Sequence, residues 1–164
     1  MRRQLSFLAA LGLAACATTD DQGAETPAPR PIKVAETEAP DPHPLASFDI
    51  PAGRCGMTLW SASGGRIAPI FQSLDVTSAT MKLDGEQVNL VLKEQSGSLH
   101  LGMRSYQVFV RPDDGGESQT VAARLDWGER FQGGLYIKGG TLAVTGADGW
   151  ERVVPIAGIA GCKA

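Results

Sequence analysis

The sequence has few of the residues from which catalytic and metal sites are usually built. Its 164 residues include only two histidines and three cysteines, and none of them has the close spacing of a zinc site. Neither the elbow of serine hydrolases nor a phosphate-binding loop occurs. His100 lies between Leu99 and Leu101 and is interpreted as a structural or surface histidine. These absences predict no catalytic residues, no metal site and a protein that is not an enzyme.

The C-terminal two thirds of the chain also lack a strong net charge. Residues 48–164 carry twelve acidic and eleven basic side chains, a net charge of −1, whereas residues 17–47 carry six acids and two bases, a net charge of −4. A domain without a strong field does not attract polyanions. We therefore expect no nucleic-acid partner.

No apolar run is long enough to span a bilayer as a helix. The longest N-terminal run, residues 5–13, has about half of the ~20 residues that a spanning helix needs. It follows Arg2 and Arg3 and is followed by small residues, which is the pattern of a secretory signal peptide. We therefore expect residues 1–15 to be a signal peptide.

The end of this run, Leu13-Ala14-Ala15-Cys16, resembles the lipobox of bacterial lipoproteins. The resemblance implies that Cys16 becomes the first residue and carries a diacylglycerol and an N-acyl chain such as palmitate, with no other cofactor expected. Because residue 17 is Ala rather than Asp, the family's sorting rule implies the outer membrane, with the domain in the periplasm. The alternative is a soluble periplasmic protein that is cleaved near Ala15.

Two cysteines remain once Cys16 is assigned to the lipid. Cys55 and Cys162 would lie in an oxidising compartment, where such a pair commonly forms a disulfide. Two unpaired buried thiols are the alternative. A bridge would close a loop of ~100 residues, which in the chain-entropy model contributes about 4–5 kcal/mol.

Composition divides the rest of the chain into a tether and one domain. Residues 16–47 are rich in proline, alanine and acidic side chains, and such a segment buries too little apolar surface to offset the entropy of ordering it. We expect a disordered linker there and one globular domain over residues 48–164.

The domain shows short alternating apolar runs separated by glycine, which predicts an all-β fold. The Asp84-Gly85 dipeptide predicts a two-residue hairpin turn in which Leu83 pairs with Glu86 and Met81 pairs with Val88. Asp148-Gly149 predicts a second hairpin in which Val144 pairs with Val153. Strands at spacings of about ten residues indicate a single antiparallel sandwich or a small barrel.

Two groups of residues are candidates for binding. The loop of Ser63, Gly64, Gly65 and Arg66 could form an anion-binding nest of backbone amides, although an ordinary turn is the alternative. The three tryptophans could form an aromatic contact surface, although tryptophans are also common in cores. They are Trp60, Trp127 and Trp150.

The sequence Ser61-Ala62-Ser63-Gly64-Gly65-Arg66 resembles the loop with which membrane-bound C-type lysozyme inhibitors plug the lysozyme cleft. The resemblance covers six residues, and the family has Tyr where this chain has Ile67. It implies a small lipid-anchored β-barrel in which Ser63 and Arg66 contact an enzyme.

These observations favour a lipid-anchored, non-enzymatic binding or structural module of the bacterial envelope. Its partners would be the membrane, through the anchor, and an envelope protein or the cell wall. An inhibitor of lysozyme or of another envelope hydrolase is one alternative, and an enzyme acting on envelope material is another. The oligomeric state stays open.

Overall fold

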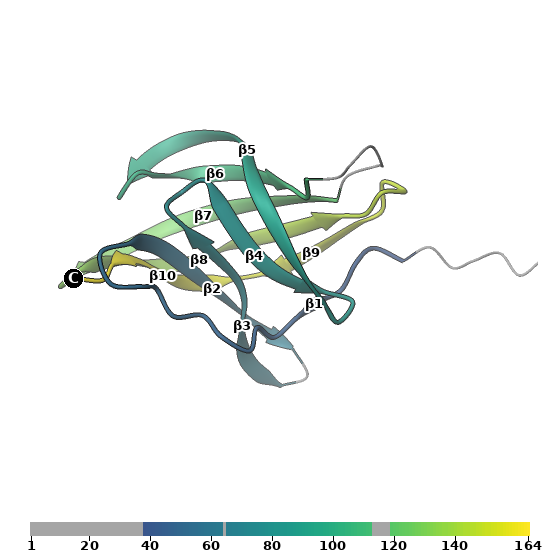
Figure 1. The fold of residues 1–164 in the computed structure, drawn as a ribbon, viewed down its shortest axis with the longest axis horizontal. Helices are drawn as coiled ribbons and strands as arrows, with labels where there is room; N and C mark the ends of the chain where they lie inside the picture. The colour runs from purple at the N-terminus through teal and green to yellow at the C-terminus, as the bar shows by residue number, and fades with distance from the viewer. Residues whose placement is uncertain (1–37, 64, 113–118) are drawn as a thin grey trace, which may run out of the picture. The chain divides into compact units, whose positions relative to one another are not determined.

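The computed structural model describes residues 38–63, 65–112 and 119–164, and this part of the chain contains strands but no helix. The predicted all-β class is therefore confirmed (Figure 1). No helix in these ranges is long and apolar enough to cross a membrane. The strands are β1 (Pro42–His43), β2 (Cys55–Ser63), β3 (Arg66–Leu74), β4 (Ser78–Leu83), β5 (Glu86–His100), β6 (Met103–Val110), β7 (Thr120–Phe131), β8 (Gly134–Thr145), β9 (Glu151–Pro155) and β10 (Ala157–Cys162).

Eight of these strands close an antiparallel barrel. Their order is β4-β3-β2-β10-β8-β7-β6-β5, and β5 pairs with β4 to complete the ring. Of the two predicted architectures, the structure is the barrel. Its core is filled by apolar side chains, among which Phe71 and Phe109 meet edge to face with ring centroids 5.3 Å apart. Other members of this core are Met57, Leu59, Met81, Leu90, Val121, Ile137, Leu142 and Val144.

The strands β9 and β10 are two halves of one interrupted strand, and both pair with β8. The interruption is at Ile156, whose amide donates to the carbonyl oxygen of Gly140 at 3.1 Å. The backbone nitrogen of Pro155, the last residue of β9, points away from β8. On that side β9 has no partner strand, because the β2–β10 register ends at Trp60 and Ala157. The missing N–H of Pro155 therefore removes no hydrogen bond from the ladder.

One predicted hairpin register is confirmed and the other is wrong by one residue. In the β4–β5 hairpin, Leu83 pairs with Glu86 and Met81 with Val88, as predicted. In the β8–β9 hairpin, Val144 pairs with Arg152 rather than with Val153. The turn there is longer than two residues, since the amide of Gly146 donates to the carbonyl of Trp150 at 2.9 Å.

The last ten residues of the expected linker belong to the fold, so the predicted domain boundary at residue 48 is wrong. Residues 38–54, which we call the strap, first pair with β4 through β1. They then pass β3 and run along the outside of the barrel to the start of β2 (Figure 1). Within the strap, Ala39, Pro40, Pro42 and Leu45 are buried. The preceding residues of the expected signal peptide and linker, Cys16 included, lie outside the described ranges.

The strap fills a gap that the β2–β3 hairpin leaves. Strand β3 pairs with β4 only as far as Met81, and β1 of the strap pairs with the next residues of β4, Lys82 and Leu83. On the other side of the gap, Arg152 of β9 contacts the strap at Glu38, 2.7 Å away, and at the carbonyl of Ala39. Prolines suit this role because the strap needs few ladder donors.

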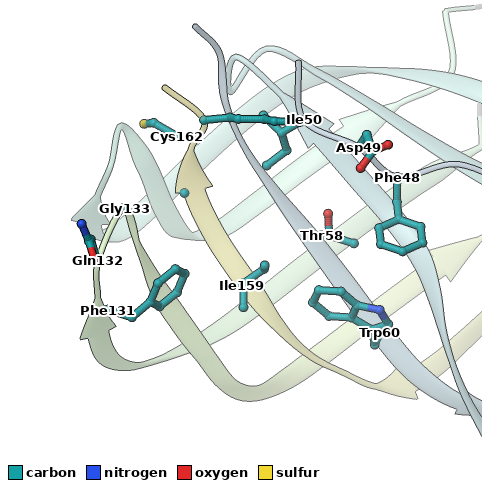
Figure 2. Close-up of a pocket in the computed structure, with 12 residues that line it drawn as sticks. Phe48, Asp49, Ile50, Thr58, Trp60, Phe131, Gln132, Gly133, Ile159 and Cys162 are labelled. Atoms are coloured by element: carbon teal, nitrogen blue, oxygen red, sulfur yellow. The ribbon is translucent and has the colours of Figure 1, made fainter. Parts of the chain in front are cut away.

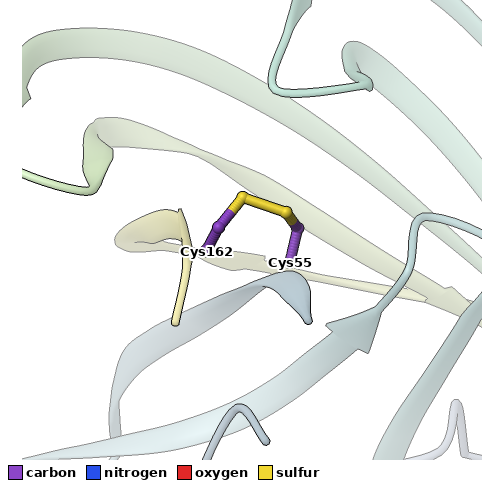
Figure 3. The surroundings of a disulfide bond; sticks show 2 residues. All are labelled: Cys55 and Cys162. Carbon is purple, nitrogen blue, oxygen red and sulfur yellow. A yellow bond between two sulfur atoms is a disulfide. The ribbon is translucent and has the colours of Figure 1, made fainter. Parts of the chain in front are cut away.

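The predicted disulfide joins Cys55 to Cys162 (Figure 3). The two residues lie directly opposite each other, at the first position of β2 and the last position of β10. Backbone pairing continues beyond them, because Lys163 exchanges hydrogen bonds with Gly53 and Arg54. The bridge therefore ties the start of the barrel, and the end of the strap, to the C-terminal strand.

Candidate binding groove on the outer barrel face

The floor of the candidate site is the outer face of β2 and β10. Along β2, Met57 and Leu59 point into the core, so Thr58 between them and Trp60 after Leu59 point outward. On β10, Ile159 pairs with Thr58 and shares its outward face. Thr58 is nevertheless only 2% exposed, because the strap lies over this part of the sheet.

Two separate segments form walls above this floor (Figure 2). One wall is the strap, where Phe48 meets the Trp60 indole edge to face at a centroid distance of 6.3 Å. The opposite wall is the turn between β7 and β8, at Phe131 and Gly133. The groove between them has a volume of about 330 Å³ and opens to solvent. We call it the outer groove.

Phe131 keeps its place because glycine lies beneath it. A methyl group on Gly134 would overlap the Phe131 ring and would lie 2.5 Å from the carbonyl oxygen of Ala160. Gly134 pairs with Gly161, which in turn pairs with Gly56. Of these three glycines, Gly134 is the one that the Phe131 ring covers, so the missing Cβ of Gly134 lets the ring lie over the sheet.

The lining of the outer groove is mainly apolar, with a few polar groups. Asp49, Gln132 and Lys163 are the residues of the lining whose side chains carry charge or an amide. Such a combination suits a ligand that buries apolar surface and is oriented by a few polar contacts.

An ion pair lies near the disulfide end of β2. Arg54 of the strap binds Asp75 in the β3–β4 turn. The hydrogen bond that Arg54 donates to Asp75, together with the positive charge of Arg54, holds the pKa of the Asp75 carboxyl below its usual range. The same hydrogen bond raises the pKa of Arg54. Both side chains are more than 40% exposed, so solvent screens the pair.

Trp60 also borders a second hollow, on the side of the β2–β3 hairpin. This hollow has a volume of about 240 Å³ and lies where β2 turns away from β9. The Ser61 hydroxyl donates to the carbonyl of Pro155 at 2.8 Å and closes its inner end. Its lining is apolar apart from Ser61 and comprises Trp60, Ser61, Ala62, Ile67, Pro155, Ile156 and Ala157.

The three tryptophans do not form one surface. Trp60 is half-buried in the outer groove. Trp127 packs against the core, with its indole nitrogen buried and its ring 5.2 Å from that of His100. Trp150 is 63% exposed in the β8–β9 turn. The expected aromatic surface is therefore reduced to Trp60 and to partners that are not tryptophans.

The predicted loop lies at the end of the β2–β3 hairpin, which extends away from the barrel body (Figure 1). Ser63 ends β2 and Arg66 begins β3. Arg66 is exposed and its neighbour Ile67 is 79% exposed. Gly65 has a positive φ of 78°, while Gly64 and the Ser63 side chain lie outside the described part of the structure. The loop does not line the outer groove.

Sequence reasoning missed most of the residues that form the outer groove. The sequence pattern assigns no role to Phe48, which begins the predicted domain, and it singles out neither Phe131 nor Ile159. One signal was present: residues 153–161 are apolar on both alternating sets, although a half-buried strand needs only one apolar face. Apolar residues on the second set of positions indicate that the outer face of this strand is covered by another segment or binds a ligand.

The outer groove offers apolar contact area and a few polar groups. Within the described ranges, no three His, Cys, Asp or Glu side chains lie together as a metal site would require. The aromatic walls and the few polar groups offer contact area and orientation instead. No protein-family model matches this chain, and no curated protein or solved structure matches it either.

Proposed function

We propose that this protein is a lipid-anchored binding module of the bacterial envelope, and that its ligand contacts the outer groove. The observation that carries the binding site is the pair of aromatic walls, Phe48 with Trp60 and, opposite, Phe131. The proposal of an anchor and an envelope location rests on the lipobox-like sequence that ends at Cys16.

The geometry favours a ligand that is bound at the surface. The barrel core is filled by side chains, and the outer groove is open to solvent. A groove of this kind can accept part of a larger molecule without enclosing it. An envelope protein or a cell-wall polymer is the kind of partner that meets this condition.

The anchor is tested by membrane fractionation of the Cys16→Ala variant. We expect the wild-type protein in the membrane fraction and the variant in the soluble fraction, because acyl chains contribute about 0.8 kcal/mol for each buried CH₂ group. Metabolic labelling with an alkyne fatty acid should mark the wild type alone. A variant that stays in the membrane would contradict the lipid anchor.

A second candidate function is inhibition of a lysozyme. It is favoured by the exposed position of Arg66 at the end of the extended β2–β3 hairpin. In this case the purified domain should inhibit a C-type lysozyme in a one-to-one ratio, and Arg66→Ala should weaken that inhibition at least tenfold. The absence of inhibition at micromolar protein would eliminate this candidate, and Trp60→Ala serves as the control for the groove.

A further inference from the structure

The barrel closes without the strap. The ring of eight strands is complete through the β4–β5 pairing, and β1 is an addition to β4. Removal of the strap would expose apolar surface near Ala39, Pro42 and Leu45. It would not break a hydrogen bond between any two strands of the ring.

The first part of the strap is held by its buried residues, by the two-residue pairing of β1 with β4, and by a small set of polar contacts. Asp41 and Asp84 exchange two hydrogen bonds of 2.9 and 3.0 Å, and the amide of Leu45 donates to the carbonyl of Pro69 at 2.8 Å. Arg152 donates to Glu38, whose side chain is 82% exposed, and to the carbonyl of Ala39, and its Nε lies 3.5 Å from Asp41 Oδ1. Because β1 is only two residues long, the side chain of Arg152 makes a large share of the polar contacts that hold this end of the strap.

The other end of the strap is fixed. Gly53 and Arg54 exchange hydrogen bonds with Lys163, and the disulfide follows immediately at Cys55. This fixed end is a turn, in which the amide of Arg54 donates to the carbonyl of Pro51 and Gly53 has a φ of 77°. The strap can therefore move away from the barrel at its first part while it stays attached at this turn.

We propose that the strap is a detachable wall of the outer groove and that Arg152 holds it closed. Phe48 belongs to the strap, whereas Trp60 belongs to the barrel. The aromatic pair therefore exists only while the strap lies in place, and its release removes one wall. The inference rests on the outer groove of the proposed function, and it depends neither on lipidation nor on the identity of the ligand.

Amide hydrogen exchange by NMR tests the proposal on the soluble protein that begins at residue 17. In the wild type, the amides of Asp41 and Leu45 should exchange faster than those of β7, because local opening precedes global unfolding. Arg152→Ala should accelerate their exchange roughly fivefold and leave the amide of Gly53 unchanged. Exchange of Leu45 only in step with β7 would overturn the proposal.

The fluorescence of Trp60 reports whether the strap covers it. In a background of Trp127→Phe and Trp150→Phe, Trp60 is the remaining tryptophan, and acrylamide quenching measures its exposure. Arg152→Ala should increase quenching. Phe48→Ala should increase it as well, without changing the exchange of the Leu45 amide, because it opens the wall without releasing the strap.

A milder variant separates the loss of the Arg152 contacts from unfolding of the barrel. If Arg152→Ala also accelerates exchange in β7, Arg152→Gln replaces it, because this change removes the charge that faces Glu38 and Asp41 and keeps much of the side-chain packing. Faster exchange at Asp41 and Leu45 with unchanged β7 then supports the detachable wall. Unchanged exchange at both residues, or unchanged quenching of Trp60, rejects it.

Discussion

At the scale of single residues, glycine determines where an aromatic wall can lie. Gly134 accepts the Phe131 ring at the position where any other residue would have its Cβ. Gly158 is constrained on the core side, because a Cβ there would contact the carbonyl oxygen of Thr58 and would lie 2.9 Å from Leu59 Cδ2. The Phe131 wall of the outer groove thus depends on Gly134, a residue that contributes no side chain to it.

Gly134→Ala should therefore destabilise the domain and displace Phe131. We expect a loss of about 1–3 kcal/mol in the free energy of unfolding, the usual cost of forcing a methyl group into a packed site. Urea denaturation measures this change. Gly139→Ala on the same strand is the matched control, because its nearest neighbouring atoms lie 4.0 Å away. Equal stability of the two variants would contradict the proposed role of Gly134.

At the scale of elements, the sequence predicts hairpins well where the turn has strict conformational needs. Asp84 and Gly85 both have a positive φ, 49° and 86°, as a two-residue turn of this type requires. In the β8–β9 turn only Gly149 has a positive φ, and the Asp148 carboxylate accepts the amide of Trp150 at 3.1 Å. The same Asp-Gly signal therefore marks two turns of different length, and the pairing shifts by one residue.

The strap shows what pattern reasoning cannot recover. Its prolines and sparse apolar residues resemble a linker, because the sequence does not reveal that β2 and β3 leave a gap for them to fill. Pro40 and Pro42 are buried by contacts with residues far away in the chain. The outer groove was missed for the same reason, since Phe48, Phe131 and Ile159 meet only in the folded barrel.

The disulfide is the element-scale constraint with the largest expected effect. Its cysteines are 107 residues apart, so replacing both by serine should lower the free energy of unfolding by about 4–5 kcal/mol in the chain-entropy model. Urea denaturation of the oxidised wild type and the double variant measures this difference. Because the backbone pairs that flank the bridge do not depend on it, far-UV circular dichroism of the folded variant should match the wild type. A difference below about 1 kcal/mol would contradict this account.

At the scale of the whole molecule, the candidate binding surfaces lie on the outer face of the barrel. Its core is filled, and its net charge is small, so neither an internal ligand nor a strong field distinguishes it. What distinguishes it is one outer face where Trp60 separates two hollows. Under the proposed function, a lipid on Cys16 would hold the domain at the membrane, and its partner would bind this face.

The most direct test of the proposed binding face is site-specific photocrosslinking in cells. A photoreactive phenylalanine analogue would replace Phe131 in the groove wall in one variant and Trp150, which is 63% exposed in the β8–β9 turn, in the other. The proposal predicts a defined crosslinked species from position 131, lost when Trp60→Ala is added, and none from position 150. Equal capture from both positions, or capture from position 150 alone, would show that the outer groove is not the binding face.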